Sequence, residues 1–149
     1  MDDLFHADTD AELRACWPAM ATLRPALADV DAFLAACARM RAGGYRILAA
    51  RAGTEVVALA GYRIQENLVF GRFLYVDDLV TLPAARGHRH GARLVEALRA
   101  IARAALCSRV VLDTGLANVR AQRFYFRAGL LPLALRFAAD AAAPRTELP

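Results

Sequence analysis

Two glycines and four cationic or imidazole side chains lie together at residues 86–91, which read Arg-Gly-His-Arg-His-Gly. An apolar run that stops at Pro83 precedes them, and an amphipathic pattern begins directly afterwards. This order predicts strand, loop and helix, which brings backbone N–H groups and the positive end of a helix dipole together. Because glycine allows close approach and arginine adds charge, the segment predicts a phosphate site. The spacing matches neither a Walker loop nor a dinucleotide fingerprint, which argues against ATP and NAD.

Two carboxylates, Asp77 and Asp78, interrupt the apolar run that leads to this loop. Neighbouring strand residues point to opposite faces, so at most one of them faces a given cleft unless a bulge intervenes. A buried carboxylate needs a partner. Either residue can therefore pair with an arginine, and either can take a proton from an ammonium group. The sequence does not separate the two.

Asn118 and Tyr125 are seven residues apart, so a helix would place both on one face. A phenol can donate a hydrogen bond to a developing thiolate. The simpler interpretations are a helix-capping asparagine and an amphipathic core tyrosine. Spacing alone favours these simpler interpretations.

The elements that must position these residues follow from periodicity and turn signals. Helices are expected at residues 9–23, where Pro18 kinks or ends the helix, from Asp29 or Asp31 to residues 43–44, from Gly91 onward, and from Asn118 to residues 128–129. Strands are expected at residues 4–7, 45–51, 55–65, 70 or 72 to 82, 109–113 and 130–137, with a frayed tail at 140–149.

This order gives an antiparallel half followed by a β-α-β half with a right-handed crossover. At 149 residues the chain is expected to form one α/β domain, residues 1–149, on a mixed sheet. The three histidines and three cysteines have no metal-site spacing, which predicts no metal.

The net charge of +4 comes from arginines that are spread along the chain. This favours a small polyphosphate cofactor over nucleic acid, although a basic nucleic-acid binder stays open as a rival. No apolar run approaches the roughly 18 residues of a membrane span, and the acidic start lacks the features of a signal peptide. We therefore expect a cytoplasmic protein without a membrane partner. The alanine and arginine bias indicates a GC-rich, bacterial genome.

Two blocks of the sequence resemble the GCN5-related N-acetyltransferases (GNAT). The first is similar to the acyl-CoA signature of the family, which is commonly Arg/Gln-x-x-Gly-x-Gly/Ala. It consists of Asp78-Leu79-Val80-Thr81-Leu82-Pro83, Arg86-Gly87 and Gly91. The second, Asn118, Ala121, Phe124-Tyr125 and Ala128-Gly129, resembles the block near the family's C-terminus. The element order also fits, so the resemblance covers about residues 8–137. Arg89 departs from the pattern, because it stands where the first glycine is usual.

The resemblance implies a GNAT-type fold, a mixed, mostly antiparallel sheet with splayed central strands flanked by helices, and acetyl-CoA as co-substrate. In that frame the strand edge pairs with the pantetheine arm, an N–H near Val80 polarises the thioester carbonyl, and the loop holds the pyrophosphate. The implied cofactor contacts are Leu79, Val80, Thr81, Arg86, Gly87, His88, Arg89, His90, Gly91, Ala92 and Asn118.

The implied activity is N-acetylation of a primary amine on a small molecule or peptide by direct attack. Asp77 or Asp78 is the implied base and Tyr125 the implied acid. The main alternative is a non-catalytic acyl-CoA-binding or sensor domain on the same fold, motivated by Arg89. Arg24, between the first two helices, either grips a carboxylate of the acceptor or is solvated. The resemblance also allows a homodimer, and the identity of the acceptor stays open.

Overall fold

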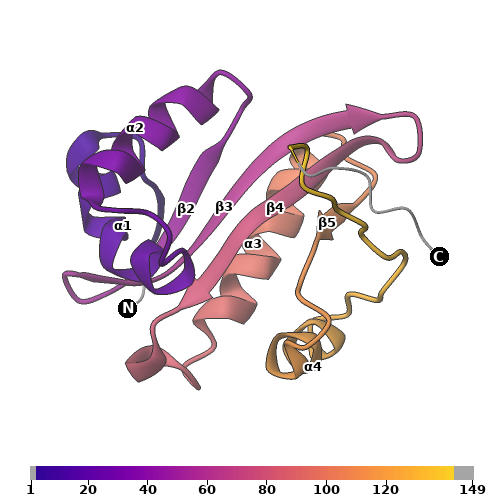
Figure 1. Cartoon of the computed structure of the whole chain (residues 1–149). Helices are drawn as coiled ribbons and strands as arrows, with labels where there is room; N and C mark the ends of the chain where they lie inside the picture. Colours follow the sequence, from indigo (N-terminus) through magenta and orange to yellow (C-terminus); the bar gives the residue numbers. More distant parts are fainter. Residues whose placement is uncertain (1–2, 143–149) are drawn as a thin grey trace. The chain divides into compact units, whose positions relative to one another are not determined.

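The computed structural model describes residues 3–142 and divides into two compact units, Met1–Leu112 and Asp113–Pro149, which we describe separately (Figure 1). The expected single domain over residues 1–149 stays a prediction. Most of the expected tail, residues 143–149, lies outside the described residues.

The first unit is built on a five-stranded sheet whose strand order follows the chain, β1-β2-β3-β4-β5. Its strands are β1 (Asp3–His6), β2 (Arg46–Ala52), β3 (Glu55–Asn67), β4 (Gly71–Thr81) and β5 (Val110–Leu112). The first four strands pair antiparallel with their neighbours in sequence, and β5 pairs parallel with β4. The expected mixed, mostly antiparallel sheet is confirmed, as is the parallel return after the crossover helix.

Helices cover both faces of this sheet. The helices α1 (Asp10–Leu23) and α2 (Val30–Arg41) share one apolar cluster with the sheet, in which Met20, Phe33 and Leu59 are buried. The helix α3 (His90–Ala104) shares a second cluster, in which Leu74, Leu94 and Leu98 are buried. Burying an apolar stripe of each helix against the sheet is the main source of stability in such a layer architecture.

Local signals explain where the first two helices begin. The Thr9 hydroxyl accepts a hydrogen bond from the Glu12 N–H, and the Glu12 carboxylate accepts one from the Thr9 N–H, so α1 starts in a capping box. Asp29 accepts a 2.8 Å hydrogen bond from the Ala32 N–H and starts α2. Pro18 lies inside α1 without ending it. The expected early end is therefore wrong, because burial of the residues around Pro18 outweighs the lost hydrogen bond.

The second unit contains the helix α4 (Val119–Arg127), which Asn118 caps by accepting a 3.1 Å hydrogen bond from the Ala121 N–H. The strand expected at residues 130–137 is wrong, because the described residues form no strand there. Apolar side chains alternate along this segment, as they would in a half-buried strand. However, no strand pairing is recorded for it within residues 3–142, and an unpaired strand is not stable.

Candidate functional site

A bulge interrupts β4 at Asp77. Gly61 of β3 pairs with Asp78, whereas the next residue, Tyr62, pairs with Val76, so Asp77 is the extra residue. A bulge of this kind breaks the regular alternation of side chains along a strand.

The two sides of the bulge show this break. Val76 packs in the cluster beneath α3, while Val80 packs in the cluster beneath α1 and α2, although an even separation would keep both on one face. Asp78 binds Tyr45, a member of the same cluster as Val80. Asp77 binds Arg63, whose guanidinium carbon lies 5.5 Å from the centre of the Tyr45 ring. Both carboxylates therefore reach the α1 and α2 side of the sheet.

Asp78 is the more buried of the two and has a donor on each oxygen. Its Oδ2 accepts a 2.6 Å hydrogen bond from the Tyr45 hydroxyl, and its Oδ1 accepts a 2.8 Å bond from Arg24 Nε. Arg24 also donates through Nη2 to the carbonyl oxygen of Asp77, at 2.8 Å. Burial, and then the charge of Asp78, raises the pKa of Tyr45, so the phenol stays protonated and remains a donor. Arg24 is thus engaged within the chain.

Asp77 forms a two-point ion pair with Arg63. Arg63 Nε donates to Oδ2 at 3.0 Å and Nη2 donates to Oδ1 at 2.9 Å, with both side chains about one-fifth exposed. Burial raises the pKa of Asp77, and the hydrogen bonds from Arg63 oppose that rise. Two carboxylates and two guanidinium groups therefore meet at the bulge with balanced charge.

Gly61 makes the room for this network. A Cβ at this position would meet the Tyr45 hydroxyl and would lie 2.5 Å from Asp78 Oδ2. No ordinary side chain fits at that distance, so the strand position opposite Asp78 requires glycine for its space.

The loop after β4 leads to a helix that starts without a side-chain cap. Residues Pro83–Ala85 form a short 3₁₀ turn, η1, and Gly87 then takes a positive φ of 88°. Arg89, the residue before α3, has a left-handed backbone with φ 65° and makes no capping hydrogen bond through its side chain. In contrast, α1, α2 and α4 each have a side-chain cap.

The amides at this helix start are available to a ligand. The backbone N–H groups of Gly87, His88, Arg89, Gly91 and Ala92 have no acceptor among residues 3–142. A Cβ at Gly87 would meet nothing within 4 Å, so there is open space above the loop. Unpaired amides at a helix N-terminus, with arginine side chains nearby, fit the diphosphate of a coenzyme A. The His90 side chain is buried, whereas His88 is exposed.

The edge of β4 next to this loop is also open. β5 pairs only with residues Leu74, Tyr75 and Val76 of β4. From Asp77 to Thr81, β4 pairs with β3 on one side and has no strand of the first unit on the other. The predicted splaying of the central strands is therefore present, at the residues that the sequence assigned to pantetheine binding.

Asn118 and Tyr125 belong to the second unit. The side-chain oxygen of Asn118 caps α4, which agrees with its simpler interpretation from sequence. Tyr125 lies in α4 with its ring edge-on to Phe124, at 5.4 Å between centroids. Burial raises the pKa of Tyr125, so its phenol stays protonated well into alkaline pH.

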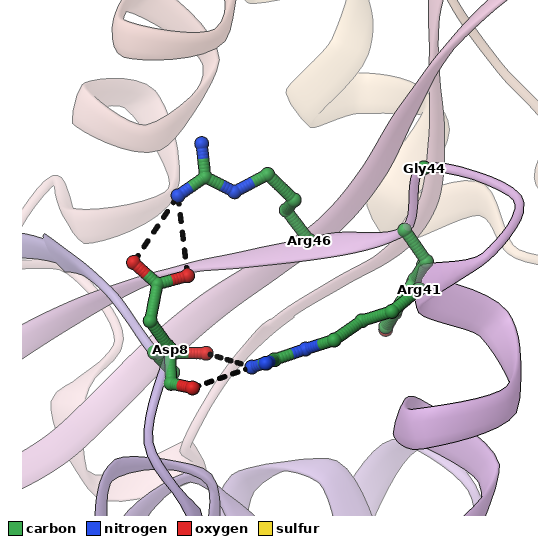
Figure 2. A pocket seen from close by; sticks show the side chains of 6 residues that line it. Asp8, Arg41, Gly44 and Arg46 are labelled. Atoms are coloured by element: carbon green, nitrogen blue, oxygen red, sulfur yellow. Dashed lines mark hydrogen bonds and ion pairs between the residues drawn. The ribbon is translucent and has the colours of Figure 1, made fainter.

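A separate cavity of about 270 Å³ lies at the turn between α2 and β2 (Figure 2). None of the predicted site residues lines it. Arg46 Nη2 donates to both carboxylate oxygens of Asp8, at 3.1 and 3.2 Å, and Arg41 donates to the carbonyls of Ala7 and Asp8, at 3.3 and 2.8 Å. These contacts tie the end of β1 to α2 and β2. Sequence reasoning missed this cluster because no motif joins partners so far apart in the chain.

The described part of the chain has no recorded metal centre, and two of its three cysteines are buried. Within residues 3–142, His, Cys, Asp and Glu side chains form no group able to hold a metal ion. Burial raises the pKa of the Cys16 thiol to about 12 and that of Cys37 to about 11, which disfavours both thiolates. In the same residues, no helix has the length and apolar content needed to cross a membrane.

Several solved structures with this fold are described as acetyltransferases. Aminoglycoside N-acetyltransferase AAC(6')-Iy in complex with CoA is 17% identical, with a TM-score of 0.85 and 96% of each chain covered. A putative acetyltransferase from Agrobacterium tumefaciens is 25% identical, with a TM-score of 0.79, covering 93% of this chain and 99% of that one. Glucosamine-6-phosphate N-acetyltransferase from Arabidopsis thaliana is 17% identical, with a TM-score of 0.76, covering 95% and 99%.

The comparison with curated proteins gives no significant match. The comparison with protein families gives one whose description is the acetyltransferase (GNAT) family, and the match extends over residues 7–130. That range contains the bulged strand, the uncapped helix start and α4. The chain therefore belongs to the acetyltransferase (GNAT) family.

Proposed function

We propose that this protein transfers the acetyl group of acetyl-CoA to a primary amine of a small molecule or peptide. The observation that carries this proposal is the start of α3, where five backbone amides have no acceptor in the described chain. They follow directly from the open edge of β4, so one ligand with a diphosphate and an extended arm can use both.

Each part of this surface has a role in binding. Gly87 to Ala92 donate backbone N–H groups to the diphosphate, while Arg86 and Arg89 add positive charge. The backbone of Leu79 to Thr81 pairs with the pantetheine arm as an added strand would. A backbone N–H near Val80 then polarises the thioester carbonyl, and Asn118 contributes a further cofactor contact. When bound, acetyl-CoA supplies the activated acetyl group.

The chemistry is a direct attack in a ternary complex. The amine nitrogen forms a bond to the acetyl carbon as the carbon–sulfur bond breaks. An ammonium acceptor loses two protons in reaching the amide. One proton reaches solvent through a carboxylate at the β4 bulge, Asp77 or Asp78. Tyr125 gives its proton to the sulfur, and the second proton from the acceptor restores the phenol. The raised pKa values of Cys16 and Cys37 support a route without a cysteine intermediate.

Two structural neighbours suggest small-molecule acceptors to test first, whereas a third is described as a ribosomal-protein-alanine N-acetyltransferase. One of them is described in complex with the bisubstrate analogue CoA-S-monomethyl-acetylneamine, and another is a glucosamine-6-phosphate N-acetyltransferase. These acceptors are amino sugars. We therefore extend the proposal to amino sugars and other small amines as the first compounds to test.

Calorimetric titration with coenzyme A and acetyl-CoA, followed by thiol release with a panel of amines, tests the proposal. We expect binding of both cofactors and acetylation of at least one amine. Binding without transfer to any amine would instead support the acyl-CoA sensor. Absence of CoA binding, together with salt-dependent DNA binding, would support the nucleic-acid rival.

A further inference from the structure

Arg24 connects the end of α1 to the bulge of β4. Its backbone N–H donates to the Met20 carbonyl at 2.8 Å, which fixes its main chain as the cap of the helix. Its side chain then reaches Asp78 through Nε and the Asp77 carbonyl through Nη2. One guanidinium therefore holds both a side chain and the main chain of the extra residue in the bulge.

Asp78 has close neighbours on three sides, and two of them bind it. Tyr45, just before β2, occupies one oxygen of the carboxylate, and Arg24 occupies the other. Gly61 of β3 lies directly across from it without a side chain. Protonation of Asp78 would remove the negative charge that strengthens both of these hydrogen bonds, which are 2.8 Å or shorter.

Exposure separates the two members of this ion pair. The Arg24 side chain is 49% exposed, whereas that of Asp78 is 10% exposed. Solvent-exposed pairs contribute little to stability, but a buried carboxylate left without its cation is costly. The charged groups that surround the pair are Arg63 and Asp77, which bind one another. The other titratable groups beside it are Tyr45 and Cys37, whose raised pKa values keep both neutral. Arg24 is thus the cation that directly binds Asp78.

We propose that Arg24 is a positioning residue, which holds the β4 bulge in its working geometry through Asp78, and that Asp78 is an anchor rather than a proton acceptor. This inference rests on the proposed acetyl transfer for its kinetic consequences only. Arg63 also binds both oxygens of Asp77, but the Asp77 side chain is 20% exposed against 10% for Asp78, so Asp77 is the carboxylate at the bulge that can exchange protons with the acceptor.

The experiment compares four single variants, and the double variant of Arg24→Met with Asp78→Asn, with the wild-type chain. Arg24→Met removes the charge and both hydrogen bonds, and Arg24→Lys keeps the charge without the planar fork. Asp78→Asn keeps the shape of the anchor. Arg14→Met is the matched control. Arg14 is a half-exposed arginine of α1, and its side chain forms a 3.0 Å ion pair with Asp31 of α2.

Hydrogen–deuterium exchange of residues 74–82 reads the geometry without any need for catalysis. We expect exchange there to rise by about tenfold in Arg24→Met, by less in Arg24→Lys, and to be unchanged in Arg14→Met. If exchange in Arg24→Met matches the wild type, the positioning role is wrong. The exchange result tests the positioning role even if no amine is acetylated. Failure to acetylate any amine would count against the proposed function alone.

Kinetics supplies the second reading. In Arg24→Met we expect kcat to fall by about tenfold while the KM for acetyl-CoA stays within about twofold, with partial recovery in Arg24→Lys. Asp78→Asn should match Arg24→Met and keep the acidic limb of the kcat/KM profile. The kcat of the double variant should be little lower than that of either single variant, because both substitutions disrupt the same Arg24–Asp78 interaction. Loss of that acidic limb in Asp78→Asn, with Arg24→Met near wild type, would make Asp78 the proton acceptor.

Discussion

Gly61 and Asp78 are partners across β3 and β4, and the space that a Gly61 side chain would need is filled by the Asp78 carboxylate and the hydroxyl that binds it. This relationship links a glycine in the middle of a strand to the polar network of the site. Glycine is unfavourable there on strand propensity alone. It is tolerated because it removes the one side chain that would displace the network.

Gly61→Ala should lower the free energy of unfolding by about 2 to 4 kcal/mol, because overpacking and a broken buried hydrogen bond act together. Urea unfolding measures this change. Tyr45→Phe in the same chain removes the hydroxyl that the new Cβ would meet. The double variant should therefore lose less than the sum of the single losses. Full additivity would contradict the close contact.

Arg89→Gly should stabilise the chain by about 1 kcal/mol, because glycine adopts the left-handed backbone of residue 89 without strain. Arg89→Ala is the control, since it removes the charge and keeps the strained φ. Thermal and urea unfolding of both variants isolate the backbone effect. Titration with coenzyme A then isolates the charge, and both variants should bind more weakly than wild type. Equal stability of the two variants would argue against strain at this position.

Arg63→Met should move the acidic limb of kcat/KM to higher pH. Burial already raises the pKa of Asp77, and Arg63 opposes this rise, so removal of Arg63 allows the pKa to climb further. The carboxylate then needs a higher pH to ionise and accept a proton. The profile should be recorded with one amine for wild type, Arg63→Met and Arg14→Met. An unmoved limb would remove Asp77 from the proton path.

Tyr125→Phe should lower kcat and leave the affinity for acetyl-CoA nearly unchanged. The proposed role of the phenol is to protonate the leaving sulfur, which affects only the transition state. Burial raises the pKa of Tyr125, so the alkaline limb of the wild-type profile should not fall below pH 10 on its account. Stopped-flow single turnover measures the chemical step, and Phe124→Leu provides a ring-packing control. An unchanged turnover rate would remove the acid assignment.

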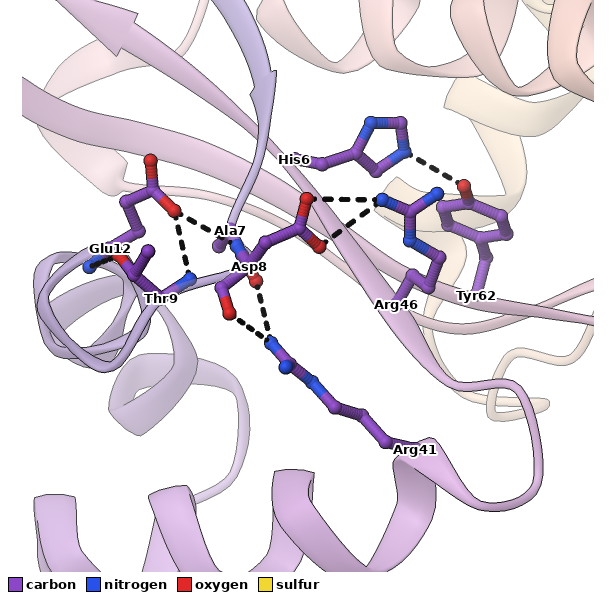
Figure 3. Close-up of polar contacts among 8 residues, drawn as sticks. All are labelled: His6, Ala7, Asp8, Thr9, Glu12, Arg41, Arg46 and Tyr62. Atoms are coloured by element: carbon purple, nitrogen blue, oxygen red, sulfur yellow. Dashed lines mark hydrogen bonds and ion pairs between the residues drawn. The ribbon is translucent and has the colours of Figure 1, made fainter.

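The free energy of unfolding should fall as the pH drops below 6.5, in part because of His6. Its Nε2 lies 2.8 Å from the Tyr62 hydroxyl (Figure 3), and burial, then Arg46, lowers its pKa. The folded chain thus favours neutral His6, and that contribution is complete above pH 6.5 and is lost as the pH falls through the lower folded pKa. The loss should be below about 1 kcal/mol, because the ring is only partly buried. His6→Gln should flatten the pH dependence, and His88→Gln, at an exposed loop residue, should not.

The sequence located most of the helices and strands. Hydrophobic periodicity and caps predicted α2, α3, α4 and the first five strands to within a few residues. Periodicity failed at residues 130–137, because alternation reports which way side chains would face in a strand but not whether a neighbouring strand exists. The sequence also predicted the helix over residues 9–23, and only the alternative of an early end at Pro18 was wrong, since packing against the sheet carries α1 past the proline.

The polar network at the bulge was the least predictable part of the site. Alternation argued that Asp77 and Asp78 face opposite sides, and only the register break places both beneath α1 and α2. The partners of Asp78 lie 33 and 54 residues away in sequence, so no local motif connects them. In contrast, Gly87 and the start of α3 were predictable because backbone amides at a glycine-rich helix start are a local feature.

The short pairing between β4 and β5 also bears on how the chain folds. Strands β1 to β4 pair antiparallel in chain order, and tight turns join β2 to β3 and β3 to β4. The pairing of β2, β3 and β4 therefore costs little loop-closure entropy. β5 reaches its place only after α3 has formed and crossed the sheet, and it gains three residue pairs there. Assembly should therefore finish at the β4–β5 seam, and because that seam stops at Val76, the edge of β4 from Asp77 to Thr81 is left without a strand of the first unit beside it.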